Sequence, residues 1–202
     1  MNKLNIPAVI FAGGKSSRMG KDKALLPFGE YKTLVEFQYE RLKKIFNNVS
    51  ISWKSEKVDL EAESILDIKK YSKISAPVIG LYSILNNLES DYVFIISVDS
   101  PFFGETEISR LTVELKNGFD IIVPTNENGA EPLIAIYNKN VLTKIEYMLK
   151  VKNYKLKQLL PHLNTKYVQY ADRKAFINLN HPEQYERAIR SLNGIEKDGE
   201  NS

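Results

Sequence analysis

Short apolar runs that alternate with segments of helical periodicity are the feature that most constrains the fold of this chain. Residues 6–12 and 92–98 lack the polar alternation of a half-exposed strand, so we interpret both as strands buried on two faces. Between them, apolar residues recur at helical spacing over residues 33–47. Strands that alternate with helices build a parallel sheet. The sequence therefore predicts an α/β fold, a Rossmann-like three-layer sandwich whose mostly parallel sheet carries helices on both faces.

Further strands and helices continue this alternation along the rest of the chain. Strands are expected over residues 49–53, 119–123 and 133–137 and at Val168; helices are expected to begin at Pro77 and Pro182 and to carry Ile108, Leu111 and Leu115, then Val141, Ile145 and Met148, then Leu156, Leu159, Leu160 and Leu163. No linker or repeat interrupts the series, so residues 1–193 are expected to form a single domain. The polar residues 194–202 are expected to form a disordered tail.

The composition excludes several classes of function. The chain has no cysteine and 2 histidines, which leaves no thiolate chemistry, no disulfide and almost no material for a histidine-rich metal site. Its net charge of +3 gives no sign of the broad basic surface that nucleic-acid binding needs. The first residues lack the apolar run of a signal peptide, and residues 92–98 are too short to span a bilayer. We therefore expect a cytoplasmic protein that binds neither nucleic acid nor membranes.

The segment 11–23, Phe-Ala-Gly-Gly-Lys-Ser-Ser-Arg-Met-Gly-Lys-Asp-Lys, follows the first expected strand. Its glycines allow close approach of the backbone, whose free amides can bind phosphate oxygens, and its lysines and arginine add positive charge. A P-loop would require a glycine in place of Val9, and a dinucleotide fingerprint would require glycines in place of Lys15 and Arg18. The segment therefore indicates a different kind of nucleotide loop, with a solvated strand–helix connection as the alternative.

Asp99 directly follows the strongly apolar residues 92–98. In a parallel sheet, ligands bind outside the carboxyl ends of the strands, where this residue and the glycine-rich loop are both expected. A carboxylate at the end of a buried strand needs a partner, and Mg²⁺ bound through one or two carboxylates plus phosphates would supply one. The alternative is that Asp99 caps a helix or a turn before Ser100-Pro101.

A second polar pair, Asn178 and Asn180, precedes the helix expected from Pro182. In an extended segment both side chains lie on one side, where their amides can bind a polar ligand. The alternative for Asn180 is that it only starts the helix.

These segments together resemble the MobA family, the molybdenum cofactor guanylyltransferases within the wider MobA-like nucleotidyltransferases. Residues 13–23 are similar to the superfamily signature Gly-Gly-x-Ser-x-Arg-Met-Gly-x-Asp-Lys. The other matching segments are Asp67 with residues 76–80 (the family aspartate and Gly-Pro-Leu-x-Gly, here with Ala76 first), residues 98–102 (the metal-binding Asp-x-Pro), residues 131–137 (the strand facing the acceptor) and residues 175–183 (Phe-x-Asn-x-Asn-x-Pro, near the pterin). The resemblance extends from about residue 6 to residue 189.

The resemblance implies transfer of GMP from GTP to the molybdopterin cofactor, with Mg²⁺ as cofactor and pyrophosphate as the second product. In that reaction the terminal phosphate of the acceptor is the nucleophile, so the enzyme needs only positioning and charge neutralisation. By resemblance, the catalytic residues are Arg18, Lys23 and Asp99, and Asp99 is also the metal ligand. The GTP-binding residues implied in the same way are Phe11, Ala12, Gly13, Gly14, Lys23, Lys54, Asp67, Gly80 and Asp99, and the acceptor-binding residues are Asn178 and Asn180. Lys54 stands where the family often carries an asparagine that holds the nucleotide.

The implied partners are the substrates, GTP and molybdopterin cofactor, together with transient contacts to cofactor-biosynthesis proteins or apo-molybdoenzymes. Two alternatives stay open from the sequence. One is a sibling transferase that uses CTP or another phosphate acceptor, and the other is a non-catalytic nucleotide-binding partner in cofactor assembly. Lys23 and Asp99 together argue against the second alternative, because binding alone does not require a complete metal and leaving-group apparatus.

Overall fold

A computed structural model describes residues 3–13, 22–55, 60–71 and 73–192. Gly14 and Arg18 of the glycine-rich loop lie outside these residues, as do the expected domain boundary at residue 193 and the tail 194–202. No helix in the described ranges is long and apolar enough to cross a membrane.

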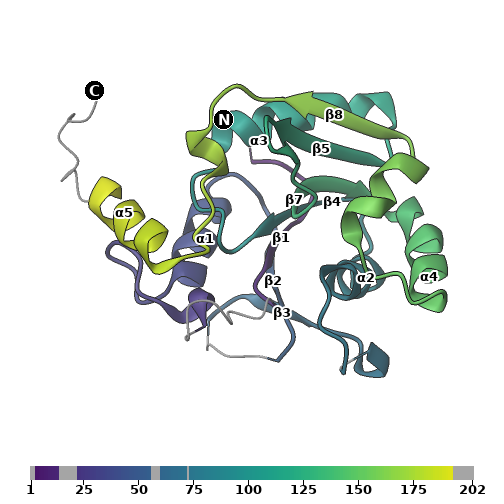
Figure 1. Cartoon of the computed structure of the whole chain (residues 1–202), viewed down its shortest axis with the longest axis horizontal. Helices are drawn as coiled ribbons and strands as arrows, with labels where there is room; N and C mark the ends of the chain where they lie inside the picture. The colour runs from purple at the N-terminus through teal and green to yellow at the C-terminus, as the bar shows by residue number, and fades with distance from the viewer. Residues whose placement is uncertain (1–2, 14–21, 56–59, 72, 193–202) are drawn as a thin grey trace.

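The described residues build one eight-stranded sheet (Figure 1). Its strands are β1 (Ala8–Phe11), β2 (Val49–Trp53), β3 (Glu63–Leu66), β4 (Tyr92–Ser97), β5 (Ile121–Asn126), β6 (Gly129–Ala130), β7 (Ile134–Asn138) and β8 (Thr165–Gln169). The order is β3-β2-β1-β4-β7-β5-β6, with β8 also paired to β5. Neighbours run parallel except that β7 is antiparallel to β4 and β5, and β6 to β5. The expected mostly parallel sheet is confirmed.

Five α-helices accompany this sheet within the described ranges. They are α1 (Leu34–Lys43), α2 (Pro77–Asn87), α3 (Glu105–Thr112), α4 (Leu142–Lys150) and α5 (Pro182–Leu192). Alternate residues of β1 divide between the two faces: Ala8 and Ile10 pack with residues of α1, α3 and α5, whereas Val9 and Phe11 pack with residues of α2 and α4. Helices therefore cover both faces of the sheet, which confirms the three-layer sandwich (Figure 1).

Local chemistry explains where the helices begin. Thr33 Oγ1 accepts a hydrogen bond from the backbone N–H of Glu36, and Glu36 Oε2 accepts one from the backbone N–H of Lys32, so two side chains cap the start of α1. Pro77 is the first residue of α2, where its missing N–H would have no helical partner anyway.

The local predictions differ from the structure in several places. Leu115 and Val141 lie in the 3₁₀ helices Val113–Asn117 and Lys139–Val141, outside α3 and α4. The apolar positions from Leu156 to Leu163 form a 3₁₀ helix, Leu156–His162, because Pro161 lies inside it and cannot donate to an α-helical ladder. The helix expected over residues 33–47 ends at Lys43. The strand β3 was missed because Ile65 is its only fully buried residue, as is common for a strand at a sheet edge.

Candidate functional site

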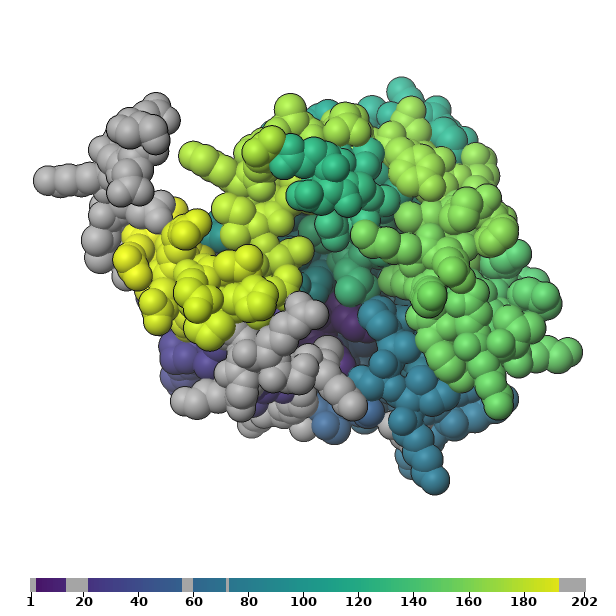
Figure 2. All heavy atoms as spheres, viewed as in Figure 1, coloured from purple at the N-terminus to yellow at the C-terminus, as the bar shows by residue number. Residues whose placement is uncertain are grey.

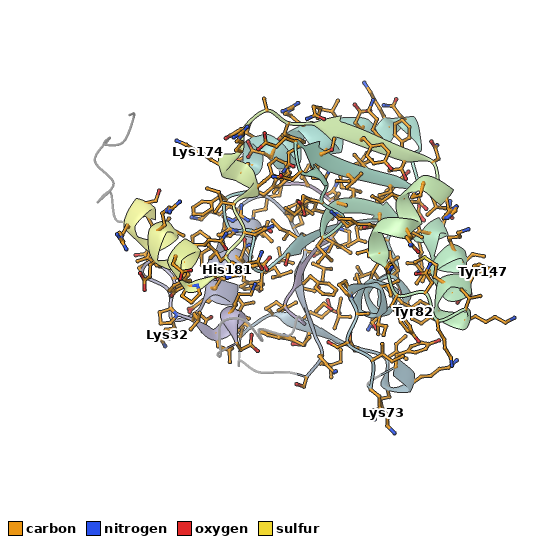
Figure 3. All side chains as sticks on the ribbon, viewed as in Figure 1. Lys32, Lys73, Tyr82, Tyr147, Lys174 and His181 are labelled. Atoms are coloured by element: carbon orange, nitrogen blue, oxygen red, sulfur yellow. The ribbon has the colours of Figure 1, made fainter. Side chains whose placement is uncertain are left out.

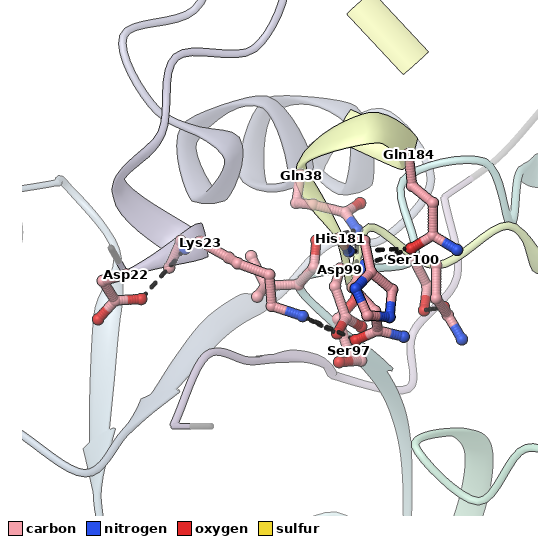
Figure 4. Close-up of polar contacts among 12 residues, drawn as sticks. Asp22, Lys23, Gln38, Ser97, Asp99, Ser100, His181 and Gln184 are labelled. Atoms are coloured by element: carbon pink, nitrogen blue, oxygen red, sulfur yellow. Dashed lines mark hydrogen bonds and ion pairs between the residues drawn. The ribbon is translucent and has the colours of Figure 1, made fainter. Parts of the chain in front are cut away.

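Three segments that are far apart in the sequence meet at the carboxyl ends of β1 and β4. Lys23 Nζ lies 2.7 Å from Asp99 Oδ2 and 3.0 Å from Asn180 Oδ1, so one ammonium group links all three (Figure 4). The Lys23 and Asp99 side chains are 14% and 20% exposed, so the ion pair is partly buried, and both residues line a cavity. The surface of the molecule is hollowed between its N-terminal, central and C-terminal segments (Figure 2). Lys23, Asp99 and Asn180 were all expected in the site, and the structure brings them together.

Lys23 is positioned by the turn that follows the glycine-rich loop. Asp22 precedes a 3₁₀ helix, Lys23–Leu25, and its Oδ1 accepts a hydrogen bond from the backbone N–H of Ala24 at 3.2 Å. Ala24 is buried in the hydrophobic core, and this packing anchors the turn. The cap and the anchor hold Lys23 at the edge of the sheet.

Asp99 is positioned by two polar residues of α1, Gln38 and Arg41, that the sequence patterns did not reveal. Gln38 is fully buried, and its Nε2 donates to the backbone oxygens of Ser97 at 3.4 Å and Val98 at 3.3 Å. Gln38 Oε1 accepts a hydrogen bond from Arg41 Nε at 3.1 Å. Gln38 lies on the apolar side of α1, and a polar residue within such a stripe is the signal that would have found it.

Arg41 extends this support to the loop that follows Asp99. Its Nη1 donates to the backbone oxygen of Phe103 at 2.7 Å. Burial lowers the pKa of the Arg41 guanidinium to about 10, and the carboxylate of Glu107 opposes that shift. A buried guanidinium that is satisfied by Gln38 and a carbonyl oxygen holds the strand end and the loop in one arrangement.

The alternative that Asp99 caps a helix is wrong. The next helix, α3, has Gly104 as its N-cap, and Glu107 completes the cap by accepting from the Gly104 backbone N–H at 3.0 Å. The Asp99 carboxylate instead pairs with Lys23, and its backbone oxygen accepts from the backbone N–H of Leu179 at 2.9 Å.

The segment with the two asparagines is fastened to the Asp99 loop. Ser100 Oγ donates to Asn178 Oδ1 at 2.7 Å, and Ser100 itself is buried. Asn180 does not cap α5 with its side chain, since its Oδ1 accepts from Lys23. The cap of α5 comes from Gln184, whose Oε1 accepts from the backbone N–H groups of Asn180 at 2.8 Å and His181 at 3.0 Å.

Two cavities meet at Asn180. The smaller cavity, of about 190 Å³, is lined by residues that include Phe11, Ala12, Lys23, Pro77, Asp99 and Asn180. The larger cavity, of about 520 Å³, is lined by residues that include Glu131, Lys174, Asn178, Asn180, Gln184 and Arg187. Lys23, Asp99 and Asn180 therefore stand where one ligand in each cavity would approach the other.

Glu131 is a carboxylate of the larger cavity that lies within electrostatic range of Asp99. Burial raises the pKa of the Glu131 carboxyl, the ammonium group of Lys157 lowers it, and the negative charge of Asp99 raises it. Within the described ranges, no group of three or more acidic or histidine residues is placed to hold a metal ion by itself. Mg²⁺ that is bound partly by substrate phosphates needs only one or two protein carboxylates, so this donor set fits it.

Three further expected GTP-binding residues, Gly13, Lys54 and Asp67, follow the carboxyl ends of the adjacent strands β1, β2 and β3. A methyl group on Gly13 would lie 3.4 Å from the backbone nitrogen of Lys54, so the ends of β1 and β2 approach closely there. Asp67 follows β3, and its backbone N–H donates to the oxygen of Trp53 at 3.0 Å. Burial raises the pKa of the Asp67 carboxyl, and the charge of Lys54 lowers it. Lys54 and Asp67 directly follow β2 and β3, which are paired in the sheet.

Gly80 has a packing role in the structure. A methyl group on Gly80 would lie 2.3 Å from Cε2 of the Phe11 ring, so glycine leaves the room that the ring occupies against α2. Phe11 lines the smaller cavity, so Gly80 affects the shape of that cavity through its contact with the Phe11 ring.

Comparison with known proteins agrees with this architecture. The family described as MobA-like NTP transferase domain matches residues 8–167. A molybdenum cofactor guanylyltransferase of Campylobacter jejuni subsp. jejuni serotype O:6 is 36% identical over 187 residues, which cover 93% of this chain and 96% of that protein. The molybdenum cofactor guanylyltransferase of Helicobacter pylori strain G27 is 33% identical over 202 residues and covers 98% of this chain, with 96% of its own length matched.

A solved structure shares the fold along nearly the whole chain. The molybdopterin-guanine dinucleotide biosynthesis protein A from Archaeoglobus fulgidus superposes with a TM-score of 0.80 at 22% identity, over 94% of this chain and 100% of that one. The resemblance that the sequence motifs indicated is confirmed. The relatives named above are nucleotidyltransferases, and this chain belongs to the same family, that of the MobA-like NTP transferase domain.

Proposed function

We propose that this protein transfers GMP from GTP to the molybdopterin cofactor and releases pyrophosphate. The observation that carries the proposal is the meeting of Lys23, Asp99 and Asn180 between two cavities, in a chain whose relatives are named as molybdenum cofactor guanylyltransferases. The smaller cavity would take the triphosphate of GTP, and the larger cavity would take the acceptor. The proposed reaction takes place in the cytoplasm.

The proposed reaction is a displacement at the α-phosphorus of GTP. An oxygen of the terminal phosphate of the acceptor forms the new P–O bond, the bond between the α-phosphorus and the bridging oxygen breaks, and pyrophosphate leaves with that electron pair. The reaction needs no nucleophile from the protein. The work of the protein is to align the two phosphates and to offset the charge that builds up between them.

Lys23 is suited to offset charge on the leaving pyrophosphate. Its ammonium group is within hydrogen-bond distance of Asp99 and lines the smaller cavity, so it can exchange its carboxylate partner for a phosphate oxygen. Arg18 is proposed to assist from the glycine-rich loop. Asn178 and Asn180 are proposed to hold the acceptor, since both line the larger cavity.

Asp99 is proposed to hold Mg²⁺, with Glu131 as a further carboxylate nearby. When bound, Mg²⁺ supplies positive charge that neutralises the phosphate oxygens. Gln38 and Arg41 would keep Asp99 in place by binding the backbone on either side of it. Gly13, Gly14, Lys54 and Asp67 are proposed to contact GTP along the neighbouring strand ends.

The test is pyrophosphate release measured with each of the four nucleoside triphosphates, with and without molybdopterin cofactor, in the presence of Mg²⁺. The proposal expects release that requires both GTP and the acceptor. Preference for CTP would show that the protein is a sibling transferase that uses a different nucleotide. Nucleotide binding by calorimetry without any release of pyrophosphate would instead indicate a non-catalytic partner in cofactor assembly.

A further inference from the structure

Three carboxamide side chains that line the larger cavity have their oxygen atoms occupied within the protein. Asn178 Oδ1 accepts from Ser100 Oγ at 2.7 Å, and Asn180 Oδ1 accepts from Lys23 Nζ at 3.0 Å. Gln184 Oε1 accepts from the backbone N–H of Asn180 at 2.8 Å. All three oxygens are therefore already hydrogen-bonded within the protein, which leaves the NH₂ groups for a ligand in the cavity.

The chemistry of the donors fixes these orientations. Ammonium groups and backbone N–H groups only donate, so the atoms facing Lys23 and the Asn180 backbone must be oxygens. A hydroxyl can donate or accept, and Ser100 Oγ donates to Asn178 in this structure. Each carboxamide keeps an NH₂ group, which only donates. Among the described residues, no protein acceptor takes up the NH₂ groups of Asn178, Asn180 or Gln184.

Positive charge and apolar surface accompany these donors. Lys174 and Arg187 line the same cavity, and Lys174 belongs to the 3₁₀ helix Lys174–Phe176 in the segment that leads into α5 (Figure 3). Phe102 and Phe176 add apolar lining. A cavity with this lining suits a ligand that has a planar ring and an anionic end.

We infer that Ser100 is a positioning residue and Gln184 a specificity residue for the acceptor, because together they make this side of the cavity donate hydrogen bonds without accepting them. The inference rests on the proposed function, and the ligand class is a phosphate ester, whose oxygens only accept. Gln184 presents its own NH₂ group to the ester. Ser100 acts through Asn178, since its hydroxyl holds the asparagine oxygen and leaves the NH₂ group for the ligand.

Gln184 also has a structural role, and the two roles can be separated. It is the third residue of α5, where its oxygen completes the helix cap by binding the backbone N–H groups of Asn180 and His181. Glutamate fills this cap as well as glutamine does. The substitution Gln184→Glu therefore preserves the cap, removes the NH₂ donor and adds a negative charge to the lining of the cavity.

The experiment compares Gln184→Glu with Asn140→Asp, which makes the same change of charge at an exposed position that follows β7. Melting temperature and the separate KM values for GTP and for molybdopterin cofactor are measured for both. Gln184→Glu should melt at or above the wild-type temperature and raise the acceptor KM about tenfold or more, with the GTP KM unchanged, since an anion loses a donor and meets a like charge. Asn140→Asp should leave all three values unchanged.

Ser100→Ala tests the positioning role. Without the hydroxyl, the Asn178 amide is free to turn its oxygen toward the ligand, so the acceptor KM should rise roughly threefold to tenfold at constant GTP KM. A residue that only packs would lower the melting temperature and leave the acceptor KM as it was. That result for Ser100→Ala, or an acceptor KM of Gln184→Glu equal to that of the Asn140→Asp control, would overturn the inference. Absence of transfer in the wild-type protein would instead reject the proposed function.

Discussion

Lys23 Nζ lies 2.7 Å from Asp99 Oδ2, and the two residues are 76 positions apart in the sequence. With side-chain exposures of 14% and 20%, the pair is shielded from solvent more than a surface ion pair is. Removing either partner from such a pair leaves a charge that is partly desolvated and has lost a counter-charge, which costs stability. Variants of either residue must therefore be measured for stability as well as for activity.

Asp99→Asn separates the charge of this residue from its shape. Asparagine keeps an oxygen that can accept from Lys23 but loses the counter-charge, so we expect the protein to fold with a moderately lower melting temperature than the wild type. A neutral amide is a poorer ligand for a hard cation, so transfer should fall by roughly tenfold to a hundredfold or more and require more Mg²⁺. The measurement is pyrophosphate release across a Mg²⁺ titration. The control is Asp91→Asn, an exposed carboxylate that should have no effect. Wild-type release at low Mg²⁺ would remove Asp99 from the mechanism.

Lys23→Ala should lose most transfer activity, and it should lower the free energy of unfolding by less than it raises the activation free energy of transfer. A charge-assisted hydrogen bond to a phosphate contributes roughly 1.5–3 kcal/mol, which corresponds to a rate loss of about tenfold to a hundredfold. The matched control is Lys43→Ala, because Lys43 forms an exposed pair with Glu40 at 3.4 Å, and such pairs contribute about 0–1 kcal/mol. Near-wild-type turnover of Lys23→Ala would show that the residue serves only as a counter-charge for Asp99.

The sequence predicted the centre of the fold, and the sheet edge at which candidate site residues meet, for a physical reason. Strands buried on both faces, such as β1 and β4, are continuous apolar runs, and parallel strands place their carboxyl ends together. Asp99 and the glycine-rich loop could thus be assigned to one edge from local patterns alone. The antiparallel direction of β7 leaves no such trace, because side-chain alternation is the same in either direction.

Local sequence patterns did not predict the contacts between segments that are distant in the chain. Nothing in the sequence near Asn180 indicates that its oxygen meets an ammonium group 157 residues away. Gln38 and Arg41 were missed because polar residues on a helix are normally solvated, and only the packing of α1 on the sheet buries them. Gly80 was assigned to GTP binding by resemblance, whereas its immediate contact in the structure is the Phe11 ring.

Gly80→Ala should destabilise the protein despite a better helix former. Alanine favours the helix by about 1 kcal/mol over glycine, but its methyl group would lie 2.3 Å from Phe11 Cε2, and overpacking costs roughly 1–3 kcal/mol. Thermal unfolding should show a lower melting temperature. Asn87→Ala, at an exposed position of the same helix, is the control and should not lower it.

A second substitution tests the cause of that loss. Phe11→Leu combined with Gly80→Ala should recover part of the melting temperature, since the smaller side chain makes room for the methyl group. An additive further loss in the double variant would contradict the steric explanation.

Asp67→Asn should raise stability at neutral pH while it weakens GTP binding. Burial raises the pKa of the Asp67 carboxyl above its ordinary value, so the folded state holds this proton more tightly than the unfolded state does. At pH values above the raised pKa, the ionised carboxylate therefore costs stability that a neutral asparagine does not cost. As the pH falls through the raised pKa, the wild-type carboxyl becomes protonated in the folded state. The difference in melting temperature between the variant and the wild type should then shrink.

Function would explain why a carboxylate that costs stability is present at the end of β3. A carboxylate accepts hydrogen bonds from hydroxyl or N–H groups of a nucleotide through two oxygens, and asparagine offers only one. Thermal unfolding between about pH 4 and pH 8, with Asp91→Asn as the exposed control, measures the first effect. Calorimetric titration with GTP and Mg²⁺ measures the second. Unchanged GTP affinity in Asp67→Asn would remove the residue from the nucleotide site, and a lower melting temperature at neutral pH would show that the ionised carboxylate stabilises the fold after all.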